Sequence, residues 1–226
     1  MSQTALVTGG TGGLGAAVTR AFLDDGWRAV VPWIAEGELE RAPERERLEL
    51  VHADLANAES VAEVVAAAGA DLRAVVNLVG GFDAPGRVHE TPFAAFEAQL
   101  RLNLQPTYLV CAAALPVLLA AGTGSIVCVS SRAALRPFPG AAGYVTAKAA
   151  VLAFVDALDA EYRDDGIRVN AILPSTIDTP ANRRAMPDAD HGKWVAPEQI
   201  AAVIVHLCSD DATVVSGAHV PVYGRA

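Results

Sequence analysis

The chain has 226 residues, of which 52% are hydrophobic and 19% charged. This apolar share excludes a disordered protein, and the length suits one sizeable core better than two small domains. The formal net charge of -9 excludes the broad basic surface that non-specific binding to nucleic acid or to anionic membranes requires. We therefore expect one domain over residues 1–226, with neither nucleic acid nor a membrane as a partner.

Short apolar runs alternate with longer Ala-rich segments along the chain. The segments predict helices near residues 14–25, 57–68, 92–120, 144–165 and 197–209. The runs predict strands at Ala5–Thr8, Arg28–Trp33, Leu48–His52, Ala74–Val79, Ser125–Ser130, Ile167–Leu173 and Ala218–Val222. Most of these runs are continuously apolar, which is typical of strands buried on both faces of a parallel sheet. The alternation predicts an α/β fold, a doubly wound parallel sheet of about seven strands with helices on both faces.

Several features argue against other classes of protein. The longest apolar run, Leu109–Ala121, is too short to span a bilayer, and the N-terminus shows no secretory signal. The five histidines form no close pair, so no metal site is expected. The three cysteines lack metal or redox spacing, which indicates reduced thiols in a cytoplasmic protein. The charged run Glu36–Glu49 is interpreted as a solvated surface segment.

A glycine-rich turn follows the first predicted strand and opens the first predicted helix. It reads Thr-Gly-Gly-Thr-Gly-Gly-Leu-Gly over residues 8–15. Glycine lets a backbone approach a pyrophosphate closely, and a helix N-terminus offers free N–H donors with a positive dipole end. A flexible turn without a ligand is the alternative, but the strand-before, helix-after context favours a nucleotide. The expected contacts are Gly9, Thr11, Gly12, Gly13, Leu14 and Gly15.

A second group of residues suits acid–base chemistry. Tyr144 and Lys148 are four apart and therefore share a helix face. A lysine ammonium beside a phenol favours the phenolate and lowers its pKa from about 10. A tyrosine tuned in this way can donate a proton to a carbonyl oxygen or remove one from an alcohol. Ser131 ends the preceding strand, where its hydroxyl could bind the same oxygen, although a plain surface Tyr and Lys remains the alternative.

These residues together resemble the short-chain dehydrogenase/reductase family, whose spacing Gly-x-x-x-Gly-x-Gly recurs at residues 9, 13 and 15. Ser131 also lies thirteen residues before Tyr144, as is common there. The resemblance implies a Rossmann-type domain that binds NAD(H) or NADP(H), with Tyr144 as the acid/base. It further implies that Lys148 tunes Tyr144 and holds the ribose, that Ser131 positions the substrate oxygen, and that Asn103 holds a water relaying protons to Lys148.

The resemblance extends to other cofactor contacts. Asp54-Leu55 looks like the adenine-contacting position, and the segment 77–80 resembles the Asn-Asn-Ala-Gly motif. The segment 170–179 looks like the one that grips the nicotinamide carboxamide. The implied contacts, which join Tyr144 and Lys148, are Asp54, Leu55, Asn77, Gly80, Pro174, Ile177 and Thr179.

The second predicted strand departs from the family. Trp33 stands where an acidic residue commonly bonds the ribose 2′-hydroxyl, and it either stacks on the adenosine or merely packs. The glutamates that follow, Glu36, Glu38 and Glu40, disfavour binding of a 2′-phosphate. Two arginines, Arg41 and Arg45, are close enough in the loop to bind such a phosphate. The balance leans slightly toward NAD(H).

The segment from residue 173 to 190, followed by Trp194, resembles the corresponding part of quinoid dihydropteridine reductase, a member of the same family. Residues 175–196 are long, polar and Pro-containing, and we expect them to form a substrate lid over the carboxyl ends of the strands. Candidate pocket walls are Phe82, Phe138, Met186 and Trp194.

The favoured function is reversible hydride transfer between the nicotinamide C4 and a small carbonyl or alcohol substrate. One alternative is a dihydropteridine reductase-like enzyme that reduces a quinoid pterin with NADH. Another is a catalytically silent, cofactor-binding regulatory protein. The family resemblance implies a homodimer or homotetramer built through the fourth and fifth helices, although the C-terminal residues 220–226 depart from the family pattern.

Overall fold

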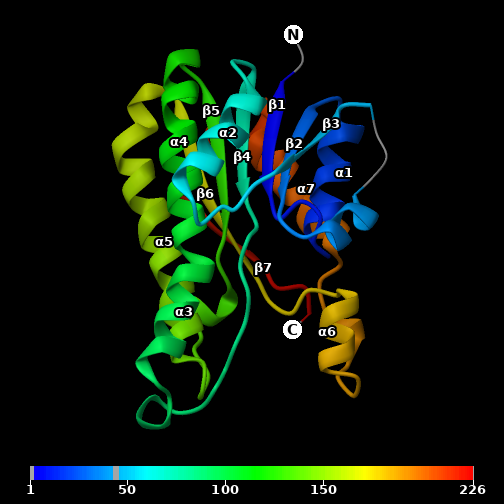
Figure 1. The fold of residues 1–226 in the computed structure, drawn as a ribbon, viewed down its shortest axis with the longest axis vertical. Helices are drawn as coiled ribbons and strands as arrows, with labels where there is room; N and C mark the ends of the chain where they lie inside the picture. Colours follow the sequence, from blue (N-terminus) through cyan, green and yellow to red (C-terminus); the bar gives the residue numbers. More distant parts are fainter. Residues whose placement is uncertain (1–2, 43–45, 226) are drawn as a thin grey trace.

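The computed structural model describes residues 3–42 and 46–225 (Figure 1). Arg45 and part of the charged run therefore lie outside the described residues. Seven strands form one parallel sheet in the order β3-β2-β1-β4-β5-β6-β7. They are β1 (Thr4–Thr8), β2 (Arg28–Trp33), β3 (Leu48–His52), β4 (Leu72–Asn77), β5 (Gly124–Val129), β6 (Ile167–Pro174) and β7 (His219–Val222).

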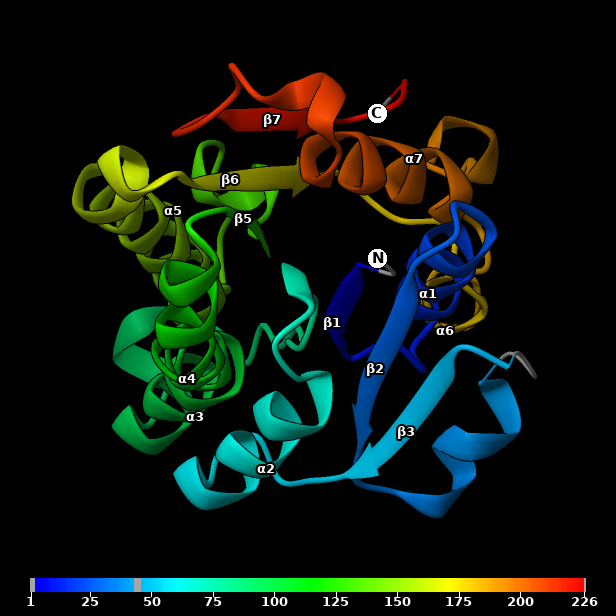
Figure 2. The same ribbon diagram turned by 90° about the horizontal axis from the view of Figure 1, so that it is seen from above.

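Helices cover both faces of this sheet (Figure 2). Helices α1 (Gly15–Asp24) and α7 (Pro197–Cys208) pack together on one face. The other face carries α2 (Ala58–Ala68), α3 (Phe93–Asn103), α4 (Gln105–Ala121) and α5 (Ala142–Tyr162). Each face has its own aliphatic core, which includes Leu6 and Ile126 on the α4 side and Val7 and Ile204 on the α7 side. The predicted doubly wound parallel α/β fold is confirmed.

The predicted helix over residues 92–120 is wrong as a single element, because it breaks at Leu104 into α3 and α4. Pro106 has no N–H to donate to the carbonyl four residues earlier, so a proline fits here at the start of a new helix. Leu104 accordingly has φ -115° and ψ -45°, away from ideal helical values. The break makes Asn103 the last residue of α3 and leaves its side chain free to bond beyond its own helix.

The helical stretch Phe93–Ala121 as a whole is longer than the apolar run seen in the sequence, and it meets a length and hydropathy criterion for crossing a membrane. In the structure α4 instead packs against α2, β4 and β5, as a layer of the domain. Contacts of this kind explain the apolar composition, because a helix in contact with a sheet and with other helices needs several apolar sides.

The segment expected to form a lid contains a short helix, α6 (Pro180–Ala185), which the sequence pattern does not predict. Thr179 caps this helix by accepting a hydrogen bond from the Asn182 N–H at 3.2 Å. An isolated bridge between Ile177 and Val195 brings the two ends of the segment together. The segment therefore forms a loop whose two ends are joined, and this loop lies beside the carboxyl ends of the strands (Figure 1).

Candidate active site

A cleft of about 710 Å³ opens above the glycine-rich turn, where β1 passes into α1. Its volume falls within the range of about 300–1,000 Å³ typical of small-molecule sites. Gly9 has φ +66°, in the left-handed region that favours glycine. A Cβ on Gly15 would collide with the Gly9 carbonyl oxygen, so this compact turn requires glycine there. The turn thereby exposes backbone at the N-terminus of α1, an arrangement suited to a phosphate group.

The structure brings most of the predicted cofactor residues to this cleft. Those that line it are Gly9, Thr11, Gly12, Gly13, Leu14, Gly15, Trp33, Asp54, Leu55 and Gly80. Thr179 lies close by, because a Cβ on Gly13 would sit 2.9 Å from the Thr179 methyl carbon. Pro174 ends β6 and Ile177 pairs with Val195, and neither of them lines the cleft.

Asn77 needs a correction, because its side chain does not line the cleft. It is 2% exposed, and its Nδ2 donates to the sulfur atoms of Cys111 and Cys128 at 3.3 and 3.6 Å. Strand β4 also ends at Asn77, two residues before its predicted end, because the Leu78 N–H donates to the Thr8 hydroxyl at 3.1 Å. Asn77 therefore fastens the end of β4 to the α4 face of the sheet.

The charged run also needs a correction, because one of its glutamates belongs to the cleft. The chain after β2 forms a 3₁₀ helix, Glu36–Arg41. Within it Glu38 is half-buried and lines the cleft, and its Oε2 accepts a hydrogen bond from Thr11 Oγ1 at 2.9 Å. Glu36 and Glu40 are exposed. No signal in the sequence distinguishes Glu38 from its two neighbours, because the turn that presents it is set by the fold.

The four predicted catalytic residues come from three neighbouring elements. Ser131 follows β5, Tyr144 lies in the first turn of α5 with Lys148 one turn later, and Asn103 ends α3. Asn103 and Lys148 approach the cleft at Gly80, which lines it. A Cβ there would lie 2.6 Å from Asn103 Oδ1 and 3.1 Å from Lys148 Nζ. The site is thus assembled at the edge of the sheet where β4 and β5 end.

Lys148 is almost completely buried, at 5% exposure. Its Nζ donates to the Val129 carbonyl oxygen at 3.0 Å, and its own main-chain carbonyl accepts from the Ser130 hydroxyl at 2.7 Å. Burial disfavours the ammonium form and lowers the pKa of Lys148 to about 8. The side chain is therefore held in place, and it loses its proton near pH 8 rather than near pH 10.5.

The pKa of Tyr144 differs from the expectation of a lowered value. Burial raises this pKa, and the hydrogen bond with the Ser131 hydroxyl opposes the rise without cancelling it. Lys148 Nζ lies 5.9 Å from the centre of the Tyr144 ring, and its charge does not offset the burial. Tyr144 therefore carries its proton at neutral pH.

Asn103 is held by a network of four hydrogen bonds that sequence reasoning did not anticipate. Its Nδ2 donates to the Gly81 carbonyl oxygen at 3.0 Å, and to the main-chain oxygen and Oε1 of Gln99 at 3.1 and 3.3 Å. Its Oδ1 accepts from the Gly81 N–H at 3.1 Å. Because both ends of the amide have partners, the position of its oxygen beside Gly80 is fixed.

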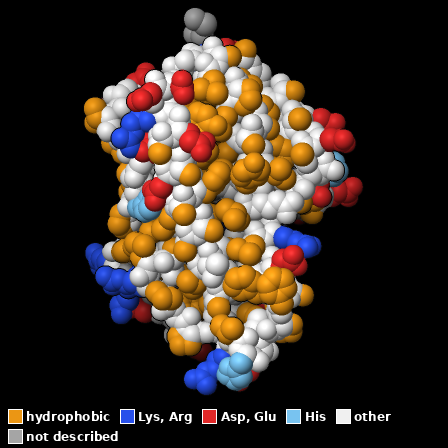
Figure 3. Space-filling view, turned by 90° about the vertical axis from the view of Figure 1, so that its left-hand side faces the viewer, with side chains coloured by type: hydrophobic (Ala, Val, Ile, Leu, Met, Phe, Trp, Pro, Cys, Tyr) orange, Lys and Arg blue, Asp and Glu red, His pale blue; other side chains and the backbone are white. Residues whose placement is uncertain are grey.

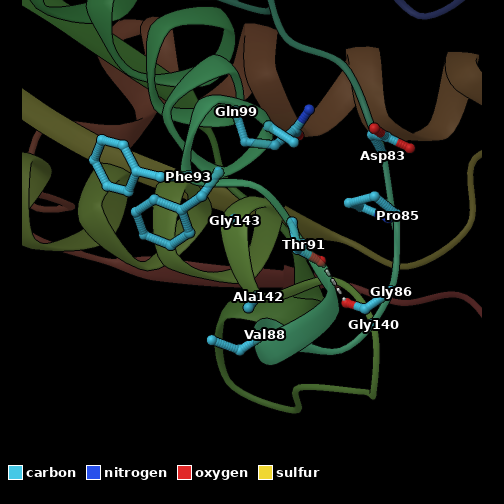
Figure 4. Close-up of a pocket in the computed structure, with 12 residues that line it drawn as sticks. Asp83, Pro85, Gly86, Val88, Thr91, Phe93, Gln99, Gly140, Ala142 and Gly143 are labelled. Atoms are coloured by element: carbon cyan, nitrogen blue, oxygen red, sulfur yellow. Dashed lines mark hydrogen bonds between the residues drawn. The ribbon is translucent and has the colours of Figure 1, made fainter.

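Gln99 also lines a second cavity of about 370 Å³, between α3 and the loops that precede α3 and α5 (Figure 4). Thr91 closes one side of it by donating to the Gly86 carbonyl oxygen at 3.2 Å. The remaining walls are mostly apolar, with Phe93 and Phe96 prominent among them. This cavity lies beside Asn103 and Tyr144, through Gln99 and Gly143, but it shares no lining residue with the glycine-lined cleft.

One of the predicted pocket walls contacts Tyr144, and a second packs against the first. The Phe82 ring packs edge-on against Tyr144, with ring centres 5.1 Å apart, and contacts Phe138 at 6.1 Å. Met186 and Trp194 lie instead in the segment around α6, where Trp194 packs against His191 at 4.3 Å. The structure therefore brings Phe82, and Phe138 through it, to Tyr144, and it leaves Met186 and Trp194 on the segment around α6.

Comparison with known proteins places the chain in a family. The short chain dehydrogenase family matches residues 3–190. The chain is 31% identical over 239 aligned positions to 2-(R)-hydroxypropyl-CoM dehydrogenase of Xanthobacter autotrophicus, covering 96% of both chains. It is 32% identical to D-threitol dehydrogenase of Mycolicibacterium smegmatis and 33% identical to cis-4-hydroxycyclohexanecarboxylate dehydrogenase of Sinomonas cyclohexanicum. In both cases 98% of this chain is covered, with 92% and 95% of the relatives.

Solved structures show the same fold. ElxO with NADP bound superposes with a TM-score of 0.92 at 24% identity, covering 99% of this chain and 98% of that one. A short chain dehydrogenase/reductase family protein superposes with a TM-score of 0.88 at 31% identity, covering 98% and 96%. The glycine turn, the parallel sheet and these matches agree, and the chain belongs to the short chain dehydrogenase family of oxidoreductases.

Proposed function

We propose that the protein is a cytoplasmic, NAD(P)-dependent dehydrogenase/reductase that interconverts a small carbonyl compound and the corresponding alcohol. The observation that carries this proposal is the grouping of four side chains at the glycine-lined cleft: Asn103 and Lys148 lie beside Gly80, and Tyr144, whose ring centre lies 5.9 Å from Lys148 Nζ, bonds with Ser131. The names of the three relatives each describe a dehydrogenase of a hydroxylated small molecule, which supports this substrate class. The free and buried state of all three cysteines agrees with a reducing compartment.

The residues present fit a nicotinamide dinucleotide. The glycine turn and the N-terminus of α1 would receive its pyrophosphate, while Asp54 and Leu55 would border its adenine. Lys148 would hold the ribose next to the nicotinamide, and Ile177 and Thr179 would contact the carboxamide. A bound dinucleotide supplies the hydride, and the NADP bound to the structural neighbour ElxO supports this class of cofactor.

The chain's own residues would handle the proton. The Tyr144 hydroxyl, which is protonated at neutral pH, donates its proton to the carbonyl oxygen during reduction, and the Tyr144 phenolate accepts a proton from the alcohol during oxidation. Ser131 binds the same oxygen, and Phe82 shields the tyrosine from one side. Lys148 and Asn103 would return a proton to Tyr144 from solvent. The Lys148 Nζ and the Asn103 Oδ1 both lie beside Gly80, which lines the cleft. The segment 175–196 acts as the lid, with Met186 and Trp194 facing the substrate when it closes.

A spectrophotometric screen tests this function. We expect the protein to oxidise NADH or NADPH in the presence of at least one aldehyde or ketone, and to reduce NAD⁺ or NADP⁺ with the matching alcohol. A quinoid pterin belongs in the same panel, because the resemblance of residues 173–190 to dihydropteridine reductase makes it the second candidate substrate. Binding of the cofactor without turnover of any compound would instead support the silent regulatory protein.

We further propose that the chain forms a homodimer or homotetramer through α4 and α5. The face built by α3, α4 and α5 exposes many apolar side chains (Figure 3). Among them Tyr108 is 55% exposed and Leu119 38%, and Tyr108 packs on Phe154 of α5. A contiguous apolar face of this kind marks an interaction surface. Light scattering is expected to give two or four times the chain mass of 23.4 kDa, and a monomer would contradict the proposal.

A further inference from the structure

The end of β2 lacks the hydrogen-bond acceptor that would select a ribose hydroxyl. Trp33 occupies this position, lines the cleft, and packs edge-on against His52 of β3 with ring centres 4.7 Å apart. An indole offers a single N–H donor and no acceptor. Trp33 can therefore supply apolar surface for an adenosine, but it cannot accept a hydrogen bond from the ribose.

Glu38 brings a carboxylate to the same wall of the cleft from five residues further along the chain. The 3₁₀ helix turns it inward, and the hydroxyl of Thr11, which is 2% exposed, donates to its Oε2. This bond joins the helix to the glycine turn and fixes where the charge lies. Because a carboxylate can accept about four hydrogen bonds, one bond from Thr11 leaves capacity for a ligand.

The charges that line the cleft reinforce this arrangement. Arg101 is the one lysine or arginine among the described residues that line it, and Arg101 forms an ion pair with Glu97 at 3.1 Å on α3. Glu38, in contrast, lines the same cleft as Trp33 and is hydrogen-bonded to Thr11 of the glycine turn. A 2′-phosphate placed there would meet a fixed negative charge, while a 2′-hydroxyl would meet an acceptor.

We propose that Glu38 determines cofactor specificity, by accepting a hydrogen bond from the 2′-hydroxyl of the adenosine ribose and repelling a 2′-phosphate. The proposal rests on the proposed function, because it requires a nicotinamide dinucleotide in this cleft. It moves the acidic determinant from the end of the strand to the 3₁₀ helix that follows, and it leaves Trp33 as the apolar wall beside the adenosine. The protein should accordingly bind NADH more tightly than NADPH.

The test measures dissociation constants of NADH and NADPH by fluorescence titration, without a substrate. Glu38→Gln keeps the side-chain size and an oxygen that can accept from Thr11, but it removes the charge. We expect the ratio of the NADPH to the NADH dissociation constant to fall about tenfold or more, mainly through tighter NADPH binding. Glu40→Gln is the matched control, because Glu40 lies on the same 3₁₀ helix but is exposed and does not line the cleft. The control should retain the wild-type ratio.

The outcomes separate this inference from the function on which it rests. If the wild-type protein binds neither nucleotide, the proposed function fails and this inference fails with it. If it binds NADH but Glu38→Gln and Glu40→Gln give the same ratio, the cofactor site stands and the role of Glu38 is wrong. Tighter binding of NADPH than NADH by the wild-type protein would likewise overturn the role of Glu38. A thermal melt of each variant shows whether the fold is retained.

Discussion

Replacement of Tyr144 by Phe is expected to lower kcat for carbonyl reduction by about 10³-fold, within the range of about 10²–10⁴ for loss of a general acid. The phenyl ring keeps the edge-on contact with Phe82, and Lys148 stays in place through its bond to Val129. The dissociation constant of NADH should therefore change by less than about threefold, or about 0.6 kcal/mol, because the substitution removes only the hydroxyl of this cofactor contact and keeps its ring. Steady-state kinetics and fluorescence titration measure the two quantities.

Tyr108→Phe is the control for this experiment, because Tyr108 lies on the outer face of α4 and its hydroxyl has no part in the proposed chemistry. Its kcat should match that of the wild-type protein.

The raised pKa of Tyr144 predicts how the rates in the two directions depend on pH. Carbonyl reduction needs the protonated phenol and should fall only at high pH, whereas alcohol oxidation should rise as the pH rises. Retention of kcat in Tyr144→Phe would remove this residue from the mechanism.

Replacement of Lys148 by Met is expected to abolish turnover and yet to relieve a cost to folding. Burial that lowers the Lys148 pKa from 10.5 to about 8 corresponds to a penalty of about 3 kcal/mol at neutral pH, at about 1.4 kcal/mol per pKa unit. Loss of the hydrogen bond to the Val129 carbonyl offsets part of this gain, by about 1–3 kcal/mol. The free energy of unfolding at pH 7 should thus be equal to that of the wild-type protein or slightly above it.

The pH dependence of the free energy of unfolding separates the contribution of the Lys148 pKa from other effects of the substitution. The folded wild-type protein releases the Lys148 proton near pH 8, while the unfolded chain keeps it until about pH 10.5, so wild-type stability rises between these values. The stability of Lys148→Met relative to wild type should therefore fall by about 2 kcal/mol from pH 7 to pH 9.5. Denaturant unfolding at the two pH values measures it.

The matched control is Lys193→Met, which replaces the other lysine of the chain. Lys193 is exposed, so its replacement should show no such trend with pH. If the two variants depended on pH in the same way, the perturbed pKa of Lys148 would be refuted. Turnover in Lys148→Met at the wild-type rate would separately refute its role in holding the ribose and relaying protons.

The amino-acid sequence by itself determined that the chain forms a parallel sheet with helices on both faces. Continuous apolar runs such as residues 74–76 and 126–128 can be buried only when both sides of a strand are covered, and the alternation with helices then requires parallel crossovers. The sequence also located the glycine turn and brought Tyr144 and Lys148 to one helix face, because spacing along a regular helix decides which side chains are neighbours. These properties depend on residues close together in the chain, so they can be predicted without the tertiary structure.

Other features depended on segments far apart in the chain. The break at Leu104 lets the Asn103 amide bond to Gly81, and the 3₁₀ helix turns Glu38 toward Thr11, while Glu36 and Glu40 stay in solvent. The pKa of Tyr144 was likewise predicted with the wrong sign, because spacing reveals the nearby ammonium but not the burial that outweighs it. Burial and long-range hydrogen bonds are set by how elements pack, so only the tertiary structure could decide which glutamate enters the cleft and which form the tyrosine takes.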